Sequence, residues 1–152
     1  MQNILLTIGA RGGSKGFRSK NIRDLAGRPL ICYTIEQALK WGKAKHVIVS
    51  TDLDKIAYVS KKCGAEVPFM RPDMLATDTA AKLPAIRHAV LESERIFGEK
   101  YEIIVDLDAT APIRTIEDLD NCLRIFINDR PDTLYSVVYA HKNPYFNMVE
   151  EN

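Results

Sequence analysis

Short apolar runs that alternate with helix-like segments restrict the fold of this chain more than any other feature of its sequence. The first run, residues 3–9, reads NILLTIG and is almost continuously apolar, as is typical of a central strand in a parallel sheet. Later runs of this kind cover residues 46–51, 65–70, 101–108 and 133–140. Their alternation with helical patterns predicts an α/β fold with a mostly parallel sheet covered on both faces.

The segments between these runs carry recognisable helix boundaries. They predict helices near residues 29–41, 52–63, 79–97 and 115–129. Asp52 is the expected N-cap of the second helix, because a carboxylate accepts hydrogen bonds from the free N–H groups at a helix start. Leu83, Ile86 and Val90 are the expected buried face of the third helix.

Composition places the chain among ordinary globular proteins. It has 152 residues, 46% hydrophobic and 27% charged, which predicts a single domain over residues 1–152 with a packed core. The formal net charge of +1 gives no global attraction for nucleic acid, although a local basic patch stays open. The N-terminal apolar run is too short for a signal peptide or a membrane span, so we expect a soluble cytoplasmic protein without membrane partners.

The three cysteines give no sign of a metal site. Cys32, Cys63 and Cys122 are widely spaced, and no Cys-x-x-Cys pair or Cys/His cluster occurs. In a cytoplasmic protein this spacing predicts buried, reduced thiols.

The strand ends indicate where a ligand binds, because α/β sheets hold ligands where the carboxyl ends of their strands meet. This rule singles out residues 9–21, 50–54 and 106–114. The first of these segments contains four glycines and four basic side chains. A basic, glycine-rich loop after the first strand is either a cradle for a nucleotide anion or a solvated surface loop.

Two common phosphate-binding motifs do not fit this loop. A Walker motif requires Lys and Ser or Thr after its last glycine, but Gly16 is followed by Phe17. The dinucleotide fingerprint requires G-x-G-x-x-G directly before a helix, and Gly9 and Gly12 have a different spacing. The position at a strand end still favours an anion cradle, since glycines let backbone N–H groups approach phosphate oxygens.

A long signature in this region resembles a known family. Residues 8–35, IGARGGSKGFRSKNIRDLAGRPLICYTI, are similar to the opening of the acylneuraminate cytidylyltransferases, the CMP-sialic acid synthetases and their relatives. Residues 47–57, 64–80 and 111–120 resemble further stretches in the family's order. The resemblance covers nearly the whole chain and implies a three-layer, Rossmann-like nucleotidyltransferase fold.

The resemblance also implies an activity: transfer of CMP from CTP to a nonulosonic (sialic-acid-like) sugar, with release of pyrophosphate and with Mg²⁺ as cofactor. Arg11, Lys15, Lys20 and Asp108 are the expected catalytic residues. The expected nucleotide-binding residues are Arg11, Gly12, Gly13, Ser14, Lys15, Lys20, Asn21, Arg71 and Lys82. Arg71 matches a family position near the nucleobase, and the alternative is a structural arginine that bonds loop carbonyls.

The chain departs from the family pattern after its fourth strand. The family usually reads L-x-Q-P-T-S-P-L-R there, whereas residues 105–114 read VDLDATAPIR, so Asp108 replaces a glutamine associated with the acceptor sugar. Asp106 and Asp108 share one side of the strand by its two-residue period. Together they are candidate Mg²⁺ ligands with waters and substrate phosphates. The alternative is that these carboxylates only cap the following turn.

Two further departures concern Lys82 and the end of the chain. The family often has a small hydroxyl residue where Lys82 stands, so the long cation there leaves the choice of nucleotide open. The chain ends with residues 143–152, and the resemblance implies that the family's later segment for dimerisation and metal binding is missing. A fragment, a minimal homologue and a member whose metal site rests on Asp106 and Asp108 stay open, as does a homodimer.

Three functions therefore remain. The preferred one is the cytidylyltransferase reaction. The alternatives are a nucleotide-binding module without catalysis and a sugar nucleotidyltransferase that uses another nucleoside triphosphate. The acceptor sugar is not determined by the sequence.

Overall fold

The computed structural model describes residues 2–13 and 19–137 of the chain. The chain divides into two compact units, residues 1–116 and 117–152. The first unit contains the parallel sheet, and the second contains nearly all of helix α4 (Ile116–Asp129). The candidate site belongs entirely to the first unit.

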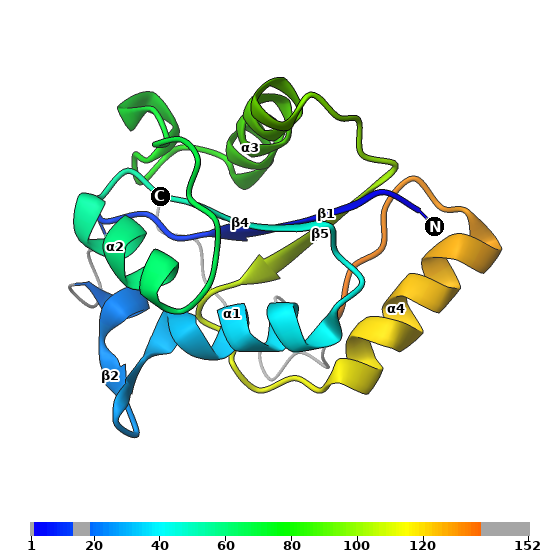
Figure 1. The fold of residues 1–152 in the computed structure, drawn as a ribbon, viewed down its shortest axis with the longest axis horizontal. Helices are drawn as coiled ribbons and strands as arrows, with labels where there is room; N and C mark the ends of the chain where they lie inside the picture. Colours follow the sequence, from blue (N-terminus) through cyan, green and yellow to red (C-terminus); the bar gives the residue numbers. More distant parts are fainter. Residues whose placement is uncertain (1, 14–18, 138–152) are drawn as a thin grey trace, which may run out of the picture. The chain divides into compact units, whose positions relative to one another are not determined.

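A parallel sheet forms the centre of the first unit (Figure 1). Its strands are β1 (Ile4–Gly9), β4 (His46–Ser50) and β5 (Ile103–Asp108), in the order β4-β1-β5. Gly9 pairs in register with Ser50 on one side and with Asp108 on the other. The carboxyl ends of the three strands are therefore level at one edge of the sheet.

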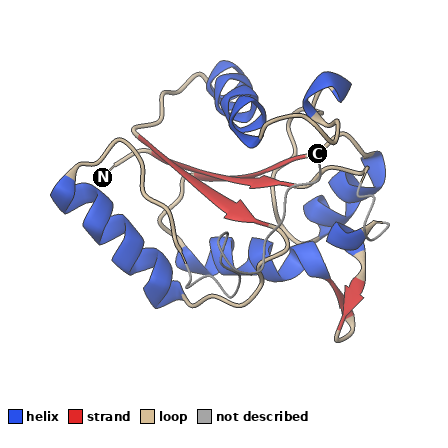
Figure 2. Cartoon of the chain, turned by 180° about the vertical axis from the view of Figure 1, so that it is seen from behind, coloured by secondary structure: helices blue, strands red, loops and turns tan. Residues whose placement is uncertain are grey.

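Helices cover both faces of this sheet (Figure 1), and Figure 2 shows the same layers from behind. Helix α3 (Lys82–Phe97) lies on one face, and α1 (Leu30–Trp41) lies on the other, beside α2 (Asp54–Lys62). Leu5, Leu6 and Ile8 of β1 are fully buried, because a central parallel strand is covered on both faces. The α/β architecture that the alternating pattern predicts is confirmed.

A short hairpin connects the loop after β1 to α1. It follows the 3-10 turn η1 (Lys20–Ile22) and consists of β2 (Asp24–Leu25) and β3 (Arg28–Pro29). Its two turn residues, Ala26 and Gly27, have φ angles of 50° and 85°, and positive φ at both central residues suits a two-residue hairpin. Helix α1 then begins directly after Pro29.

The predicted buried face of α3 is wrong. Leu83 is 73% exposed, and Ile86 and Val90 are only half-buried. The buried residues are instead Ala85, Ala89 and Ser93, spaced four residues apart along the helix. Small side chains let a helix lie close to the sheet, so the largest apolar residues do not mark the contact. The helix also begins at Lys82 rather than near residue 79.

Two predicted strands are not formed as expected. The run at residues 65–70 makes a single parallel bridge, Ile48 with Glu66, because Pro68 lacks the N–H that continued pairing requires. The 3-10 turn η2 (Asp73–Leu75) follows. No strand is assigned to the described residues 133–137, and the rest of the run predicted at 133–140 lies outside the described residues.

The predicted N-cap of α2 is also wrong. The N-cap position is Leu53, and no side chain caps this helix end. The Asp52 carboxylate instead accepts a hydrogen bond from the Gly12 N–H at 2.8 Å. Asp52 thereby ties the loop after β1 to the loop after β4, a contact across 40 residues that helix-capping patterns do not contain.

The cysteines differ from the expectation of buried, reduced thiols. Cys32 of α1 and Cys63, at the end of α2, form a disulfide with a Cα–Cα distance of 5.5 Å, and Cys122 is exposed. The pair is 31 residues apart in sequence. It meets because α1 and α2 pack against one another, which the spacing alone does not indicate.

Candidate active site

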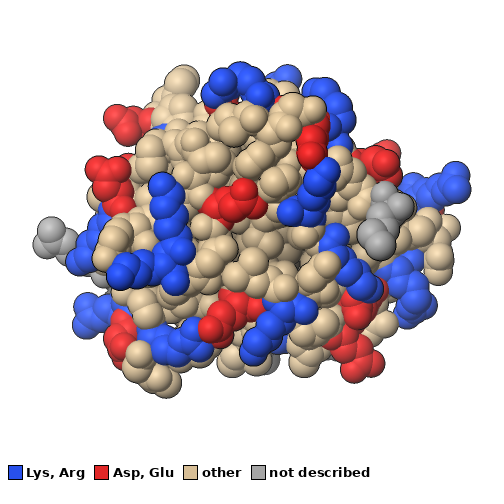
Figure 3. Space-filling view, in the orientation of Figure 1, with Lys and Arg blue, Asp and Glu red and all other residues tan. Residues whose placement is uncertain are grey.

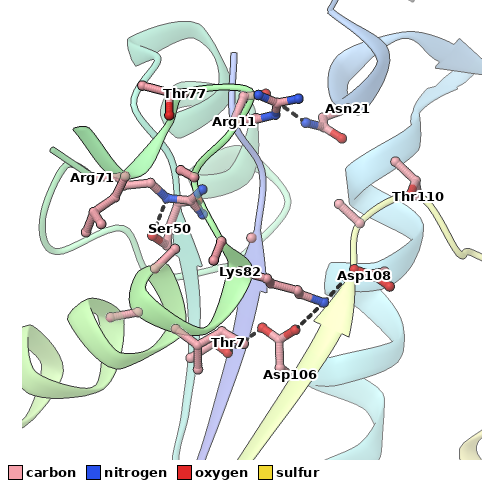
Figure 4. A pocket seen from close by; sticks show the side chains of 18 of the residues that line it. Thr7, Arg11, Asn21, Ser50, Arg71, Thr77, Lys82, Asp106, Asp108 and Thr110 are labelled. Atoms are coloured by element: carbon pink, nitrogen blue, oxygen red, sulfur yellow. Dashed lines mark hydrogen bonds and ion pairs between the residues drawn. The ribbon is translucent and has the colours of Figure 1, made fainter. Parts of the chain in front are cut away.

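A cavity of about 230 Å³ lies at the carboxyl edge of the sheet, where β1, β4 and β5 end. Strand ends, the loop after β1 and residues between 71 and 89 line it. The sequence-predicted site residues that line it are Arg11, Lys20, Asn21, Arg71, Lys82, Asp106 and Asp108. Figure 4 shows how most of these side chains face one another. Segments far apart in the sequence therefore meet at one place.

The remaining predicted residues are in the glycine-rich loop. Ser14 and Lys15 lie outside the described residues. Gly12 and Gly13 are described but do not line the cavity. A Cβ on Gly12 would lie 3.0 Å from the Cβ of Leu53, so this glycine allows the loop to pack closely on the start of α2.

Four hydroxyl residues of the cavity were not singled out from the sequence: Thr7, Ser50, Thr77 and Thr110. Thr7 gave a usable signal, because a lone hydroxyl inside the apolar run of residues 3–9 must find a hydrogen-bond partner once it is buried. Ser50 falls in a strand-end segment that the sequence did indicate. Thr77 and Thr110 lie in loops and gave no comparable signal.

Arg11 is held at the cavity by two contacts. Its guanidinium forms an ion pair with Asp78, with 2.7 Å between Nη1 and Oδ1. Its carbonyl accepts a hydrogen bond of 3.0 Å from the side chain of Asn21, which is buried. The backbone is therefore fixed, while the guanidinium, about one third exposed, can exchange its carboxylate partner for a phosphate.

Arg71 is an unusual buried cation, only 8% exposed. Its Nε donates to the Ser50 hydroxyl at 3.0 Å and its Nη2 donates to the Ser50 carbonyl at 2.8 Å. No carboxylate among the described residues is within ion-pair distance of it. Burial lowers the pKa of Arg71, and the nearby Asp52 and Asp106 oppose that shift. The guanidinium thus has structural bonds and also carries unpaired charge beside the cavity.

Gly9 leaves the space that the Arg71 side chain occupies. A Cβ on Gly9 would lie 3.2 Å from Arg71 Nη2, closer than most real Cβ contacts. A glycine at the end of β1 therefore lets the guanidinium lie directly against the strand end.

Two carboxylates at the end of β5 surround one ammonium group. The Nζ of Lys82 lies 2.7 Å from Asp106 Oδ2 and 2.7 Å from Asp108 Oδ1. Asp106 also accepts a 2.8 Å hydrogen bond from Thr7 Oγ1. Partial burial alone lowers the pKa of Lys82, but the hydrogen bonds to the two carboxylates outweigh it, so the pKa is raised.

Hydrogen bonds from two other side chains hold the backbone of Asp108 in place. Its carbonyl accepts hydrogen bonds from Thr34 of α1 at 3.3 Å and from Arg114 at 3.0 Å. Arg114 also bonds the Ala111 carbonyl, and burial lowers the pKa of its guanidinium. Gln37 of α1 bonds the carbonyls of the same loop, so the strand end that carries Asp108 is anchored to α1.

The donor set at this edge fits Mg²⁺ bound together with a nucleotide. No group of three or more Asp, Glu, His or Cys residues in the described chain is arranged around a metal position. Mg²⁺ does not need one, since it commonly takes one or two carboxylates and completes its octahedron with water and phosphate oxygens. Asp106 and Asp108, which converge on a single cation, supply such a pair.

The rest of the surface adds little to these local features. On the face drawn in Figure 3, basic and acidic side chains are interspersed. None of the helices in the described part of the chain is long and apolar enough to cross a bilayer.

Comparison with known proteins assigns the family. The sequence profile of the family described as cytidylyltransferase matches residues 5–148. The chain belongs to this cytidylyltransferase family. Enzymes of the family typically use a divalent metal. The resemblance to acylneuraminate cytidylyltransferases that the sequence indicates is therefore confirmed.

Several relatives of this cytidylyltransferase come from bacteria. The "Post-translational flagellin modification protein B" of Campylobacter coli is 45% identical, and the CMP-N,N'-diacetyllegionaminic acid synthase of Campylobacter jejuni is 47% identical. Each alignment covers 99% of this chain and 64% of the relative, so the chain spans slightly less than two thirds of their length. The N-acylneuraminate cytidylyltransferase of Escherichia coli is 36% identical over 81% of this chain and 28% of its own.

The fold has a solved counterpart. The structure of a CMP:2-keto-3-deoxy-manno-octonic acid synthetase in complex with CTP matches with a TM-score of 0.68, over 85% of this chain and 49% of that one. The two sequences are 21% identical, so the match concerns the fold alone. It confirms the nucleotidyltransferase-like α/β fold that the sequence predicts.

Proposed function

We propose that this cytidylyltransferase transfers CMP from CTP to a nonulosonic acid and releases pyrophosphate. Family membership and relatives named for such sugars support the proposal. One observation on the site carries it: Arg11, Lys20, Arg71 and Lys82 converge on a single cavity at the strand ends. The positive charge of these side chains suits the negative charge of a nucleoside triphosphate. The carboxyl edge of a parallel sheet is also where α/β proteins bind nucleotides.

In the proposed reaction the sugar hydroxyl attacks the α-phosphorus of CTP and gives up its proton to solvent. The bond to the bridging oxygen breaks as pyrophosphate leaves with the electron pair. Arg11 and Lys20, together with Lys15 of the same loop, neutralise the triphosphate and the departing pyrophosphate. Mg²⁺ held by Asp106 and Asp108 would supply further positive charge at the phosphates. The chain's own contribution is to position the reactants and to stabilise charge.

Arg71 has a different proposed role, at the nucleobase. Two of its nitrogens are fixed by Ser50, so the guanidinium keeps one orientation against the cavity wall. A rigid donor group is suited to the carbonyl oxygen of cytosine. The same contacts also support the strand end, so the structural and nucleobase roles of Arg71 are compatible.

A thermal-shift panel of CTP, UTP, ATP and GTP with Mg²⁺ tests the nucleotide first. A ligand at a hundred times its Kd stabilises the folded state by about 2.7 kcal/mol, which is roughly 5–11 °C for a chain of this size. The largest shift should come from CTP. A larger shift with another nucleotide would favour the nucleotidyltransferase alternative, and CTP binding without pyrophosphate release from any tested nonulosonic acid would favour the non-catalytic module.

Two substitutions test the residue roles. Lys20→Ala should remove most pyrophosphate release, because it deletes a charge at the triphosphate, and Arg71→Met should weaken CTP binding. Lys40→Ala is the matched control, since Lys40 is an exposed cation in the last turn of α1 and does not line the cavity. Unchanged turnover in the Lys20 variant, or an equal loss in the control, would contradict the assignment.

We further propose that the enzyme works in the cytoplasm, where CTP is available. A homodimer remains a proposal from the family resemblance, and light scattering on the purified protein decides it.

A further inference from the structure

The two unusual residues of the sequence, Lys82 and Asp108, are partners in the structure. Lys82 stands where the family often has a small hydroxyl residue, and Asp108 stands where it usually has glutamine. The Lys82 ammonium lies between the carboxylates of Asp106 and Asp108, at 2.7 Å from each (Figure 4). Each departure therefore explains the other, because the added negative charge of Asp108 is matched by the added positive charge of Lys82.

The carboxylates are the fixed part of this cluster, and the ammonium is the replaceable part. Asp106 is bonded to the buried hydroxyl of Thr7 and its side chain is only 16% exposed. The backbone of Asp108 is held by Thr34 and Arg114. The side chain of Lys82, in contrast, is 55% exposed and reaches the pair through a flexible four-carbon stem.

An ammonium in this position competes with a metal ion. Mg²⁺ binds carboxylate oxygens at about 2.0–2.1 Å, so an ion bridging Asp106 and Asp108 through their facing oxygens needs the space that Lys82 Nζ occupies. The second oxygen of Asp106 is already used by Thr7. The position between the two facing oxygens is therefore closed to a divalent cation until Lys82 moves away.

We propose that Lys82 holds the metal position of the substrate-free site and is displaced when a divalent cation binds between Asp106 and Asp108. The inference rests on the proposed function insofar as it takes this pair as the metal site. It makes Lys82 a positioning residue that sets how readily the site accepts metal.

The decisive experiment is a titration of the nucleotide-free protein with Mn²⁺, followed by electron paramagnetic resonance of the free ion. Lys82→Met keeps the length of the side chain and removes its charge. This variant should bind Mn²⁺ at least roughly tenfold more tightly than the wild type. The reason is that a Lys82 ammonium bound to the carboxylates about nine-tenths of the time weakens the apparent Mn²⁺ affinity about tenfold. Lys82→Arg should stay near the wild type. Lys61→Met, an exposed cation of α2, controls for the change in net charge.

Unchanged or weaker Mn²⁺ binding in folded Lys82→Met overturns the inference, as does an equal gain in Lys61→Met. A second measurement uses the wild-type chain, so it does not depend on the folding of a variant. Acetylation of Lys82 by acetic anhydride, followed by mass spectrometry, should become faster when Mn²⁺ is added, since displacement releases the side chain from the two carboxylates that hold it in the protonated, unreactive form. A rate that stays the same or falls with Mn²⁺ also overturns it.

The outcomes separate this inference from the proposed function. If CTP binds and is turned over but Lys82→Met leaves Mn²⁺ affinity unchanged, the inference fails and the function stands. If no nucleotide binds, the function fails, while the Mn²⁺ titration still decides the inference because it contains no nucleotide. If the tight Mn²⁺ binding of Lys82→Met survives Asp108→Asn, the ion binds elsewhere and the inference fails.

Discussion

Replacing Thr7 with valine tests whether the site is built into the core of the sheet. Thr7 is 1% exposed in the central strand, and its hydroxyl donates to Asp106 at 2.8 Å. Valine keeps the branched shape and removes only the hydrogen bond. A hydrogen bond to a charged group contributes about 1.5–3 kcal/mol, and because water reaches part of Asp106, we expect a loss of about 1.5–2 kcal/mol.

Urea unfolding followed by tryptophan fluorescence measures this loss. Trp41 is the only tryptophan of the chain and is buried in the same unit as Thr7. The expected change corresponds to a fall in Tm of about 3–8 °C. Thr7→Ser, which keeps the hydroxyl, separates the hydrogen bond from the packing of the methyl group.

Thr34→Val is the matched control. Thr34 is equally buried, but its hydroxyl makes a longer bond of 3.3 Å to a neutral acceptor, the Asp108 carbonyl, which Arg114 also serves. Its loss should be about 1 kcal/mol or less. A Thr7→Val protein within about 0.5 kcal/mol of the wild type, or a Thr34→Val loss of the same size, would refute the importance of the bond to Asp106.

Two further predictions concern stability. Burial, and then three nearby glutamates, raise the pKa of Tyr101 to about 12, while the unfolded phenol ionises near 10. The contribution of Tyr101 to the free energy of unfolding is therefore fully present below about pH 10 and is lost as the pH rises toward 12. In denaturation curves at pH 9–11, Tyr101→Phe should remove this loss. Reduction of the Cys32–Cys63 disulfide, which closes a 31-residue separation, should cost about 3.7 kcal/mol, as should Cys32→Ala. Cys122→Ser should cost almost nothing, because Cys122 is exposed and lies outside the disulfide. The chain unfolded without a reductant should show one thiol reactive to Ellman's reagent; no loss of stability on reduction, or three reactive thiols, would contradict the disulfide.

The sequence predicts the fold well where the signal is local. Buried parallel strands have a characteristic apolar run, so the strand that contains Leu5 and Ile8 was recognisable from a few residues. The glycines after α1 and α3, Gly42 and Gly98, have φ angles of 65° and 68° and end their helices as such patterns indicate. The predictions from sequence were wrong where the size of an apolar side chain did not match its burial. In α3, for example, Leu83 is exposed and Ala89 is buried.

The sequence by itself determined the alternation of strands and helices, the edge of the sheet at which the cavity lies, and most of the charged residues gathered there. Only the tertiary structure decided their pairings. Asp52 bonds the Gly12 N–H instead of capping a helix, and Lys82 lies between Asp106 and Asp108. These contacts join residues separated by 24 to 40 positions. Strand and helix periods act over a few residues, whereas such contacts depend on the register of β1 with its neighbours, which no local pattern specifies.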